Sequence, residues 1–373
     1  MRKLIFKAHM YVGLCVGLLL ALMGLTGSML VFGDELDVFL NPSLLSVEPR
    51  GERVSIEDVL KSVRQAYPSE KVARIRFPHE REGTYELCFE AKTDARCVYV
   101  DPYSAAVLGS RVPARSFKGR LVSLHRRLLS GATGETIIGV GGILLLLLSL
   151  SGALLWWPGR RNLARGWTIR WKNSRYRVNY DLHRIVGICA MLFLSFSAVT
   201  GAAMVFRPSL ERALNRLASA PPPKPKPTST VVEGQRAPLD EIIRNADAAL
   251  PQGELTMINL PATRAATVVV RKRVEGELHP HGRSLVYLDQ YSGQVLLAEN
   301  ALEAPPVART FGNLFPLHVG RLGGILTRLL QVFVGFVPAI LFCTGLLMWR
   351  SRVRARKLSK KSQPVYSQSE ALS

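Results

Sequence analysis

Four long apolar runs constrain the fold of this chain more than any other feature. They cover residues 10–33, 136–157, 185–206 and 329–349, and they are 24, 22, 22 and 21 residues long. A helix of about 20 apolar residues is long enough to cross the hydrocarbon core of a bilayer. A soluble protein of 373 residues would have to bury four helices that are apolar on every side. The sequence therefore predicts an α-helical membrane protein with a bundle of four transmembrane helices.

The net charge of +21 is concentrated in three short segments. These segments, 1–8, 158–184 and 350–373, together hold 18 basic and 2 acidic side chains. The two long segments, 34–120 and 207–320, together hold 27 basic and 25 acidic side chains. Short basic segments beside spans stay in the cytoplasm. Both termini and the central loop are therefore predicted to be cytoplasmic, and the two long segments to lie outside. The basic excess fits contact with the anionic headgroups of a lipid bilayer, and we predict no nucleic-acid partner.

The chain also repeats itself. At an offset of 174 residues, His9 aligns with His183, and at an offset of 193 the pair Leu124–His125 aligns with Leu317–His318. Each half therefore has the same order: a span that begins with His, an outside segment, a Leu-His motif and a second span. Because this order is constant, we predict two parallel repeats with one shared topology.

Each outside segment is predicted to be an α+β domain. Residues 55–68 and 237–250 carry apolar side chains at helical spacing. VYVDPYSAAVL (98–108) and VYLDQYSGQVL (286–296) alternate like strands around a turn and share seven of eleven residues. The predicted boundaries are 1–33 for an uncleaved first span, 34–120 for the first outside domain, 121–157 for the Leu-His motif and second span, 158–182 for a basic cytoplasmic loop, 183–206 for the third span, 207–316 for a proline-rich linker (220–227) and the second outside domain, 317–349 for the Leu-His motif and fourth span, and 350–373 for a cytoplasmic tail.

These motifs resemble the PepSY-associated transmembrane family, which includes iron-regulated inner-membrane proteins and siderophore reductases of Gram-negative bacteria. The resemblance covers nearly the whole chain. It implies two PepSY-like periplasmic domains, location in the bacterial inner (cytoplasmic) membrane and b-type haem held by histidines. For some members it also implies reduction of ferric siderophores at the periplasmic face. The chain departs from the family pattern at Gln290, where Pro is expected, and at Ala105, where Gly is expected.

Four of the seven histidines lie at the ends of spans. A single histidine at a helix end is more often an interfacial anchor, but two pairs related by the repeat favour a shared role as ligands. Two imidazoles from facing helices can supply both axial ligands of a haem iron. We therefore predict two haem b groups, one held by His9 and His183 near the cytoplasmic face and one held by His125 and His318 near the outer face.

Gly13 and Gly187 follow His9 and His183 by four residues, so each lies on the same helix face as its histidine. They are predicted as cofactor-binding residues that leave room for a porphyrin, and close helix packing is the alternative. Zinc or copper is the alternative metal that paired histidines could bind. No Cys, His or carboxylate cluster of suitable spacing accompanies these pairs in the sequence.

The outside segments hold two further groups. Cys88 and Cys97 lie on two predicted strands, and strand register decides whether they can form a disulfide. The HPH motif at His279–His281 is predicted as a polar hairpin loop, with contact to a metal outside as the alternative, and His79 as a surface residue.

Haem iron with two axial histidine ligands has no open site for oxygen, so it suits electron transfer. We predict an oxidoreductase that takes electrons from a cytoplasmic or quinone donor and reduces a ferric siderophore in the periplasm, which releases Fe(II). No catalytic residue is predicted. Two alternatives remain: a PepSY membrane sensor, regulator or peptidase-binding protein without redox activity, and a transporter, since parallel repeats occur in carriers. Colour distinguishes them, because only the first function requires bound haem.

Overall fold

The computed structural model describes residues 1–218 and 225–361, and the chain divides into two compact units. We call them the membrane unit (residues 1–28, 139–202 and 330 onward) and the sheet unit (residues 29–138 and 203–329). The predicted linker at 220–227 lies mostly outside the described residues, and so does the end of the predicted tail, 362–373.

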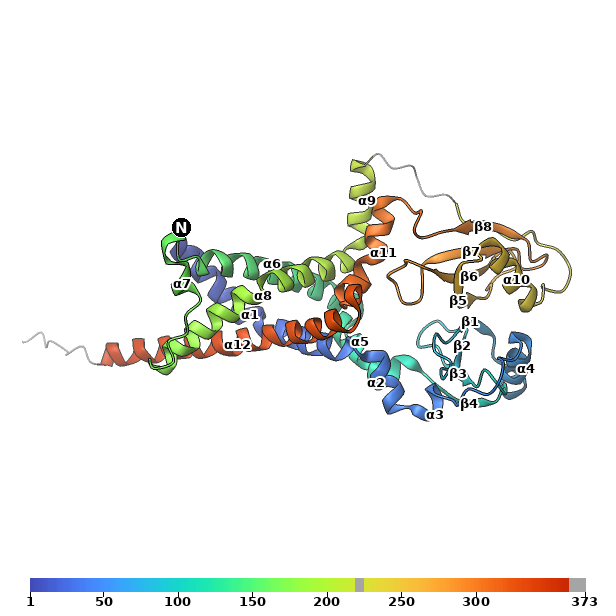
Figure 1. Cartoon of the computed structure of the whole chain (residues 1–373), viewed down its shortest axis with the longest axis horizontal. Helices are drawn as coiled ribbons and strands as arrows, with labels where there is room; N and C mark the ends of the chain where they lie inside the picture. Colours follow the sequence, from blue (N-terminus) through green and yellow to red (C-terminus); the bar gives the residue numbers. More distant parts are fainter. Residues whose placement is uncertain (219–224, 362–373) are drawn as a thin grey trace, which may run out of the picture. The chain divides into compact units, whose positions relative to one another are not determined.

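Within the described residues, four helices are long and apolar enough to cross a membrane, as the sequence predicted. They are α1 (Arg2–Leu30), α6 (Gly131–Trp156), α8 (Arg175–Val205) and α12 (Gly324–Lys361), and their ribbons can be followed in Figure 1. All four are longer than their apolar runs. α8 begins inside the predicted basic loop, and α12 continues into the predicted tail, because neither 175–184 nor 350–361 contains Gly or Pro.

Two close crossings hold the membrane unit together. A Cβ atom at Gly24 of α1 would clash with the backbone carbonyl of Gly335 on α12, and Ser28 Oγ donates to the carbonyl of Val332, 2.8 Å away. On the other pair of helices, a Cβ at Gly142 of α6 would lie 3.2 Å from the carbonyl oxygen of Ala198 on α8. Small residues thus bring backbones together, as is usual for helices in lipid.

The sheet unit contains one antiparallel sheet with the strand order β4-β3-β2-β1-β5-β6-β7-β8. The sequence had predicted two separate outside domains, but the structure joins their strands in this one sheet, through pairing of β1 with β5. The strands are β1 (Val72–Arg76), β2 (Tyr85–Phe89), β3 (Cys97–Val100), β4 (Val107–Arg111), β5 (Gly253–Asn259), β6 (Val268–Val274), β7 (Ser284–Leu288) and β8 (Val295–Glu299).

The helices α4 (Ile56–Ala66) and α10 (Leu239–Ala249) cover one face of this sheet. α4 begins where predicted, because Ser55 Oγ accepts a hydrogen bond from the Asp58 amide and caps the helix. Their apolar faces share one core with the strands, which includes the fully buried Val59, Ile75, Leu87, Ile242, Ile258 and Val286. One hydrophobic core therefore spans both predicted domains.

Shorter helices connect the sheet to the spans. In the sheet unit these are α2 (Gly33–Leu40), α3 (Pro42–Leu45), α5 (Phe117–Arg127), α9 (Arg207–Leu217) and α11 (Pro306–His318), with 3₁₀ turns at Pro113–Arg115 and Arg321–Gly323. The loop of the membrane unit contains a 3₁₀ turn at Arg160–Asn162 and α7 (Leu163–Gly166). Asp181, the single acid of the predicted basic loop, is fully buried on α8 and accepts from the Arg170 amide, so it ties this loop to the helix.

The two departures from the family pattern have clear local consequences. Ala105 adopts a left-handed backbone with φ 54°, as Gly293 does with φ 68° at the matching turn of the other half. An alanine there carries a steric strain of about 1–2 kcal/mol that glycine avoids. Gln290 is buried, and its side-chain Nε2 donates to the carbonyls of Thr263, Arg264 and Ala266. A proline could not make these contacts.

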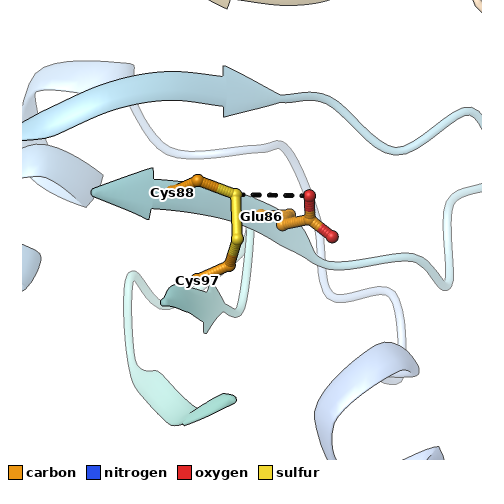
Figure 2. A group of neighbouring side chains, drawn as sticks. All are labelled: Glu86, Cys88 and Cys97. Carbon is orange, nitrogen blue, oxygen red and sulfur yellow. Dashed lines mark hydrogen bonds between the residues drawn. A yellow bond between two sulfur atoms is a disulfide. The ribbon is translucent and has the colours of Figure 1, made fainter. Parts of the chain in front are cut away.

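Cys88 and Cys97 face each other across β2 and β3 and form a disulfide (Figure 2). The bond packs against Tyr99, Leu44 and Leu45 on the side of the sheet opposite α4. The Glu86 carboxylate lies 3.5 Å from Cys88 Sγ, but sulfurs joined to each other offer no thiolate to a metal. The register thus decides the question that the sequence left open.

Candidate functional site

His9 on α1 and His183 on α8 face each other in the membrane unit. Their ring centres lie 6.4 Å apart, and their ring planes make an angle of 88°. Two imidazoles that bind one metal ion from opposite sides have ring centres about 6.3 Å apart, because each metal–nitrogen bond is about 2.0 Å long and each nitrogen lies about 1.15 Å from its ring centre. The observed separation therefore fits one metal ion between the two rings.

Ser151 of α6 and Thr344 of α12 orient the two rings. His9 Nδ1 lies 2.9 Å from Ser151 Oγ, and His183 Nδ1 lies 2.8 Å from Thr344 Oγ1. Each hydroxyl donates its own hydrogen to a carbonyl of its own helix. Which atom donates in each contact depends on which ring nitrogen carries the proton. A proton on Nδ1, donated to the hydroxyl oxygen, would leave the Nε2 lone pair of both histidines for a metal.

Sequence reasoning missed these two hydroxyl residues, although a signal was present. The offset of 193 that aligns Gly152 with Gly345 also aligns Ser151 with Thr344. Each glycine lies beside the imidazole that its neighbour holds. A Cβ at Gly152 would lie 3.3 Å from His9 Cε1, and a Cβ at Gly345 would lie 3.7 Å from Cε1 of the other ring. We call His9 and His183 the inner histidine pair. A Ser-Gly or Thr-Gly pair thus accompanies each histidine of the inner pair.

A cavity of about 640 Å³ surrounds the inner histidine pair and is lined by all four long helices. This volume falls in the range of about 300–1,000 Å³ that is typical of cofactor sites. Most of its lining is aliphatic or aromatic, and Arg2, Lys3, Arg184 and Arg352 add positive charge. Among the described residues that line it, none is acidic. An apolar, positively charged cavity between two imidazoles fits a flat apolar ring that carries carboxylates.

Gly13 and Gly187 both line this cavity. A Cβ at Gly13 would meet only a leucine methyl at 3.8 Å, and a Cβ at Gly187 only another at 3.7 Å. These are ordinary contact distances, unlike the clash at Gly24. Close helix packing therefore does not require glycine at either position. The absence of a side chain at both positions leaves more open space beside the histidines.

His125 and His318 form a second pair, in the sheet unit. Their ring centres lie 6.5 Å apart with an angle of 52° between the planes, so this pair also matches the spacing of about 6.3 Å for two axial imidazoles. The sequence placed these histidines at the ends of spans, but they lie on α5 and α11, the short helices that precede α6 and α12. Leu128 and Gly320 separate these elements, because both adopt the left-handed conformation that ends a helix.

The remaining histidines lie close together, which the sequence did not predict. His79 Nε2 is 3.0 Å from His281 Nδ1, and the ring centres are 5.2 Å apart in nearly parallel planes. His79 Nδ1 also lies 3.2 Å from the carboxylate of Glu254. A separation of 3.0 Å between two nitrogens is that of a direct hydrogen bond. This arrangement is therefore a hydrogen-bonded chain that joins the first and second halves of the sheet.

Burial, and then the positive charge of Arg283, lower the pKa of His279 to about 4. Burial, and then the charge of Arg76, lower the pKa of His281 to about 3. An unfolded chain protonates histidine near pH 6.5. Between pH 6.5 and about pH 4 or 3, both histidines are protonated in the unfolded state but neutral in the folded state. Their contribution to the stability of the sheet unit is therefore fully present above pH 6.5 and is lost as the pH is lowered towards 4.

Hydrogen exchange tests this pH dependence. Protection factors of the β6–β7 peptides, corrected for the intrinsic exchange rate, are expected to be lower at pH 5 than at pH 7.5. The variant with His279→Gln and His281→Gln is expected to lose most of this difference. Equal protection of the wild-type peptides at both values would contradict the pKa assignment.

No curated protein matches the chain. The PepSY-associated TM region matches residues 6–352, nearly the whole chain, including both histidine pairs and the sheet unit between the spans. The chain therefore belongs to the PepSY-associated transmembrane family.

Proposed function

We propose that this protein is an oxidoreductase of the bacterial inner membrane that carries electrons from a cytoplasmic or quinone donor to a ferric siderophore in the periplasm. His9 and His183 would hold one haem b, and His125 and His318 a second. Bound haem would supply reversible one-electron chemistry. The two halves would be parallel repeats, with the termini in the cytoplasm and the sheet unit outside, as the distribution of basic residues favours.

The observation that carries this proposal is the spacing of the histidine pairs. Separations of 6.4 Å and 6.5 Å both match two imidazoles on opposite sides of one iron. A protein that fills both axial positions leaves no position for oxygen or substrate, which favours electron transfer. The acceptor chemistry is consistent with this role, because Fe(III) chelates are much tighter than Fe(II) chelates and one electron suffices to loosen the metal.

An anaerobic reoxidation experiment tests the function. Protein purified from haem-replete cells is reduced with dithionite, freed of excess reductant and mixed with ferric chelates while the b-type absorption bands are followed. The proposal expects the bands of the reduced protein to decay with formation of one Fe(II) per electron, trapped by a ferrous indicator. A colourless preparation, or reduced bands that no ferric chelate alters, would overturn it.

The hydroxyl residues give a finer prediction. Ser151→Ala and Thr344→Val each remove the acceptor of one imidazole Nδ1–H, and second-shell changes of this kind cost about 10–100-fold in metal affinity. A weaker hydrogen bond also makes the imidazole a poorer donor to Fe(III), so the reduction potential of the inner haem is expected to rise. Spectroelectrochemical titration measures that shift, and Thr136→Val, on the same helix but outside the cavity lining, is the control. Two unchanged potentials and unchanged haem retention would exclude this role for both hydroxyls.

A further inference from the structure

The face of the sheet opposite α4 and α10 carries an unusual charge pattern. Residues that pair directly across strands share a face. One row on this face consists of Tyr99, Glu86, Arg76, Met257, Arg271 and Leu285. The next row consists of Cys97, Cys88, Arg74, Asn259, Val269 and Tyr287. Arg74, Arg76 and Arg271, here named the arginine cluster, thus lie at the centre of the sheet, on both sides of the β1–β5 junction.

The acids of the sheet unit compensate this cluster only in part. Burial and neighbouring arginines lower the pKa of both Arg74 and Arg271, whereas Glu86 raises the pKa of the first and Glu277 that of the second. Arg76 makes one ion pair, with Glu86 at 3.5 Å. Within residues 1–218 and 225–361, Arg74 donates only to Cys88 Sγ, 3.3 Å away, and no carboxylate lies at ion-pair distance from Arg271. All three side chains are partly buried, and the Nε atom of each is buried without a hydrogen-bond partner in that part of the chain.

The arginines also repel one another. Burial, and then the charge of Arg76, lower the pKa of both Arg74 and Arg271. Arg271 in turn acts on Arg283 at the edge of β7, whose pKa is lowered by burial first and then by its cationic neighbours. Partly buried charges of one sign are costly unless an opposite charge approaches them. An anion placed over this face would relieve that cost.

The spacing indicates the size of the anion. Arg76 and Arg271 lie on strands separated by one other strand, β5, so their Cα atoms are about 10 Å apart. Arginine forms paired hydrogen bonds to carboxylate oxygens. A ligand that satisfies both side chains needs oxygen anions on two sides of a body several ångströms wide.

We propose that the arginine cluster is the docking site for the acceptor, and that the acceptor is an anionic ferric chelate with carboxylate or catecholate oxygens. This inference rests on the proposed function and names the substrate class for it. A neutral or cationic hydroxamate chelate lacks the charge that this face requires. His281 stays neutral down to about pH 3, so the arginines supply the attraction at neutral pH.

Binding is tested with a chelate that cannot be reduced, which separates docking from electron transfer. Gallium(III) citrate is anionic and matches the charge of the ferric complex, whereas a gallium(III) tris-hydroxypyranone chelate is neutral. Titration calorimetry on the full chain in nanodiscs is expected to give saturable binding of the anionic chelate that weakens with added salt. It is expected to give no saturable binding of the neutral chelate.

The matched variants have equal charge. Arg76→Gln with Arg271→Gln is expected to weaken binding of the anionic chelate at least about tenfold, because two charge-assisted contacts are lost. Arg64→Gln with Arg244→Gln removes the same charge from exposed positions on α4 and α10, and it should bind like the wild type. Hydrogen exchange of β1, β5 and β6 checks that both variants keep the sheet. The variant with Arg76→Lys and Arg271→Lys should bind with intermediate affinity.

The outcomes separate the two proposals. If the variant with Arg76→Gln and Arg271→Gln loses binding of the anionic chelate, the docking site is supported, whether or not the protein carries haem. If the wild type binds neither chelate, binds both equally, or binds the anionic chelate as well after the cluster substitutions, the docking site is wrong. Reoxidation by all ferric chelates regardless of charge would also overturn it while leaving the proposed function intact.

Discussion

Replacing His183 with Ala is expected to lower the b-type absorbance of the reduced protein to about half, because one of the two proposed haems would lose an axial ligand. His9 would remain as a single ligand in a cavity whose other wall offers only a methyl group. His9→Ala is expected to have the same effect, and the double variant no further one, because both histidines serve one site. Pyridine haemochrome analysis per mole of protein provides the measurement.

His79→Ala is the matched control for these substitutions. It removes a partly buried histidine that is hydrogen-bonded within the sheet unit and belongs to neither pair. The control is expected to keep the full haem content. Retention of both haems in His183→Ala would refute the assignment of the inner pair.

Gly24→Ala is expected to destabilise the membrane unit strongly. The new Cβ would clash with the backbone carbonyl of Gly335, and a backbone contact cannot move aside as a side chain can. Overpacking of this kind costs about 1–3 kcal/mol, and more where no rearrangement relieves it. Because α1 carries His9 and α12 carries Thr344, separation of these helices is also expected to lower the haem content. Unfolding in graded detergent mixtures measures the change in stability.

Gly13→Ala provides a control on the same helix. A Cβ at Gly13 has only an ordinary contact at 3.8 Å. This substitution should therefore leave the free energy of unfolding within a few tenths of a kcal/mol of the wild-type value, or raise it because alanine has the higher helix propensity. If Gly24→Ala and Gly13→Ala had the same stability, the close crossing of α1 and α12 would not exist in the protein.

The spans were predictable because length and hydropathy alone decide them. Their ends were not, since the helical stretches at 175–184 and 350–361 are polar and carry no apolar pattern. Among the strands, β1 and β5 went unrecognised. Arg74 and Arg76 alternate with Ile75 in β1, which is a short pattern, and no turn motif of the VYVD type marks either strand. These two strands join the halves of the sheet, so the sequence did not predict that one sheet runs through both outside segments.

The site was partly predictable for a similar reason. Histidines are rare in this chain, so repeat-related pairs stood out, and the glycines followed from their spacing. Ser151 and Thr344 differ from each other in side chain, which hid their equivalence until hydrogen bonds to the two imidazoles revealed it. The contact between His79 and His281 joins residues 202 positions apart, and only the β1–β5 pairing brings them together.

Electron paramagnetic resonance of the oxidised, purified protein examines the coordination of iron most directly. Two haems per chain and low-spin ferric signals alone are expected, since imidazoles would fill both axial positions of each proposed haem. The signal of the inner haem should be the more anisotropic, because perpendicular imidazole planes, as found for His9 and His183 at 88°, leave the iron orbitals closest to degenerate. A preparation without haem, or one dominated by a high-spin ferric signal, would contradict it.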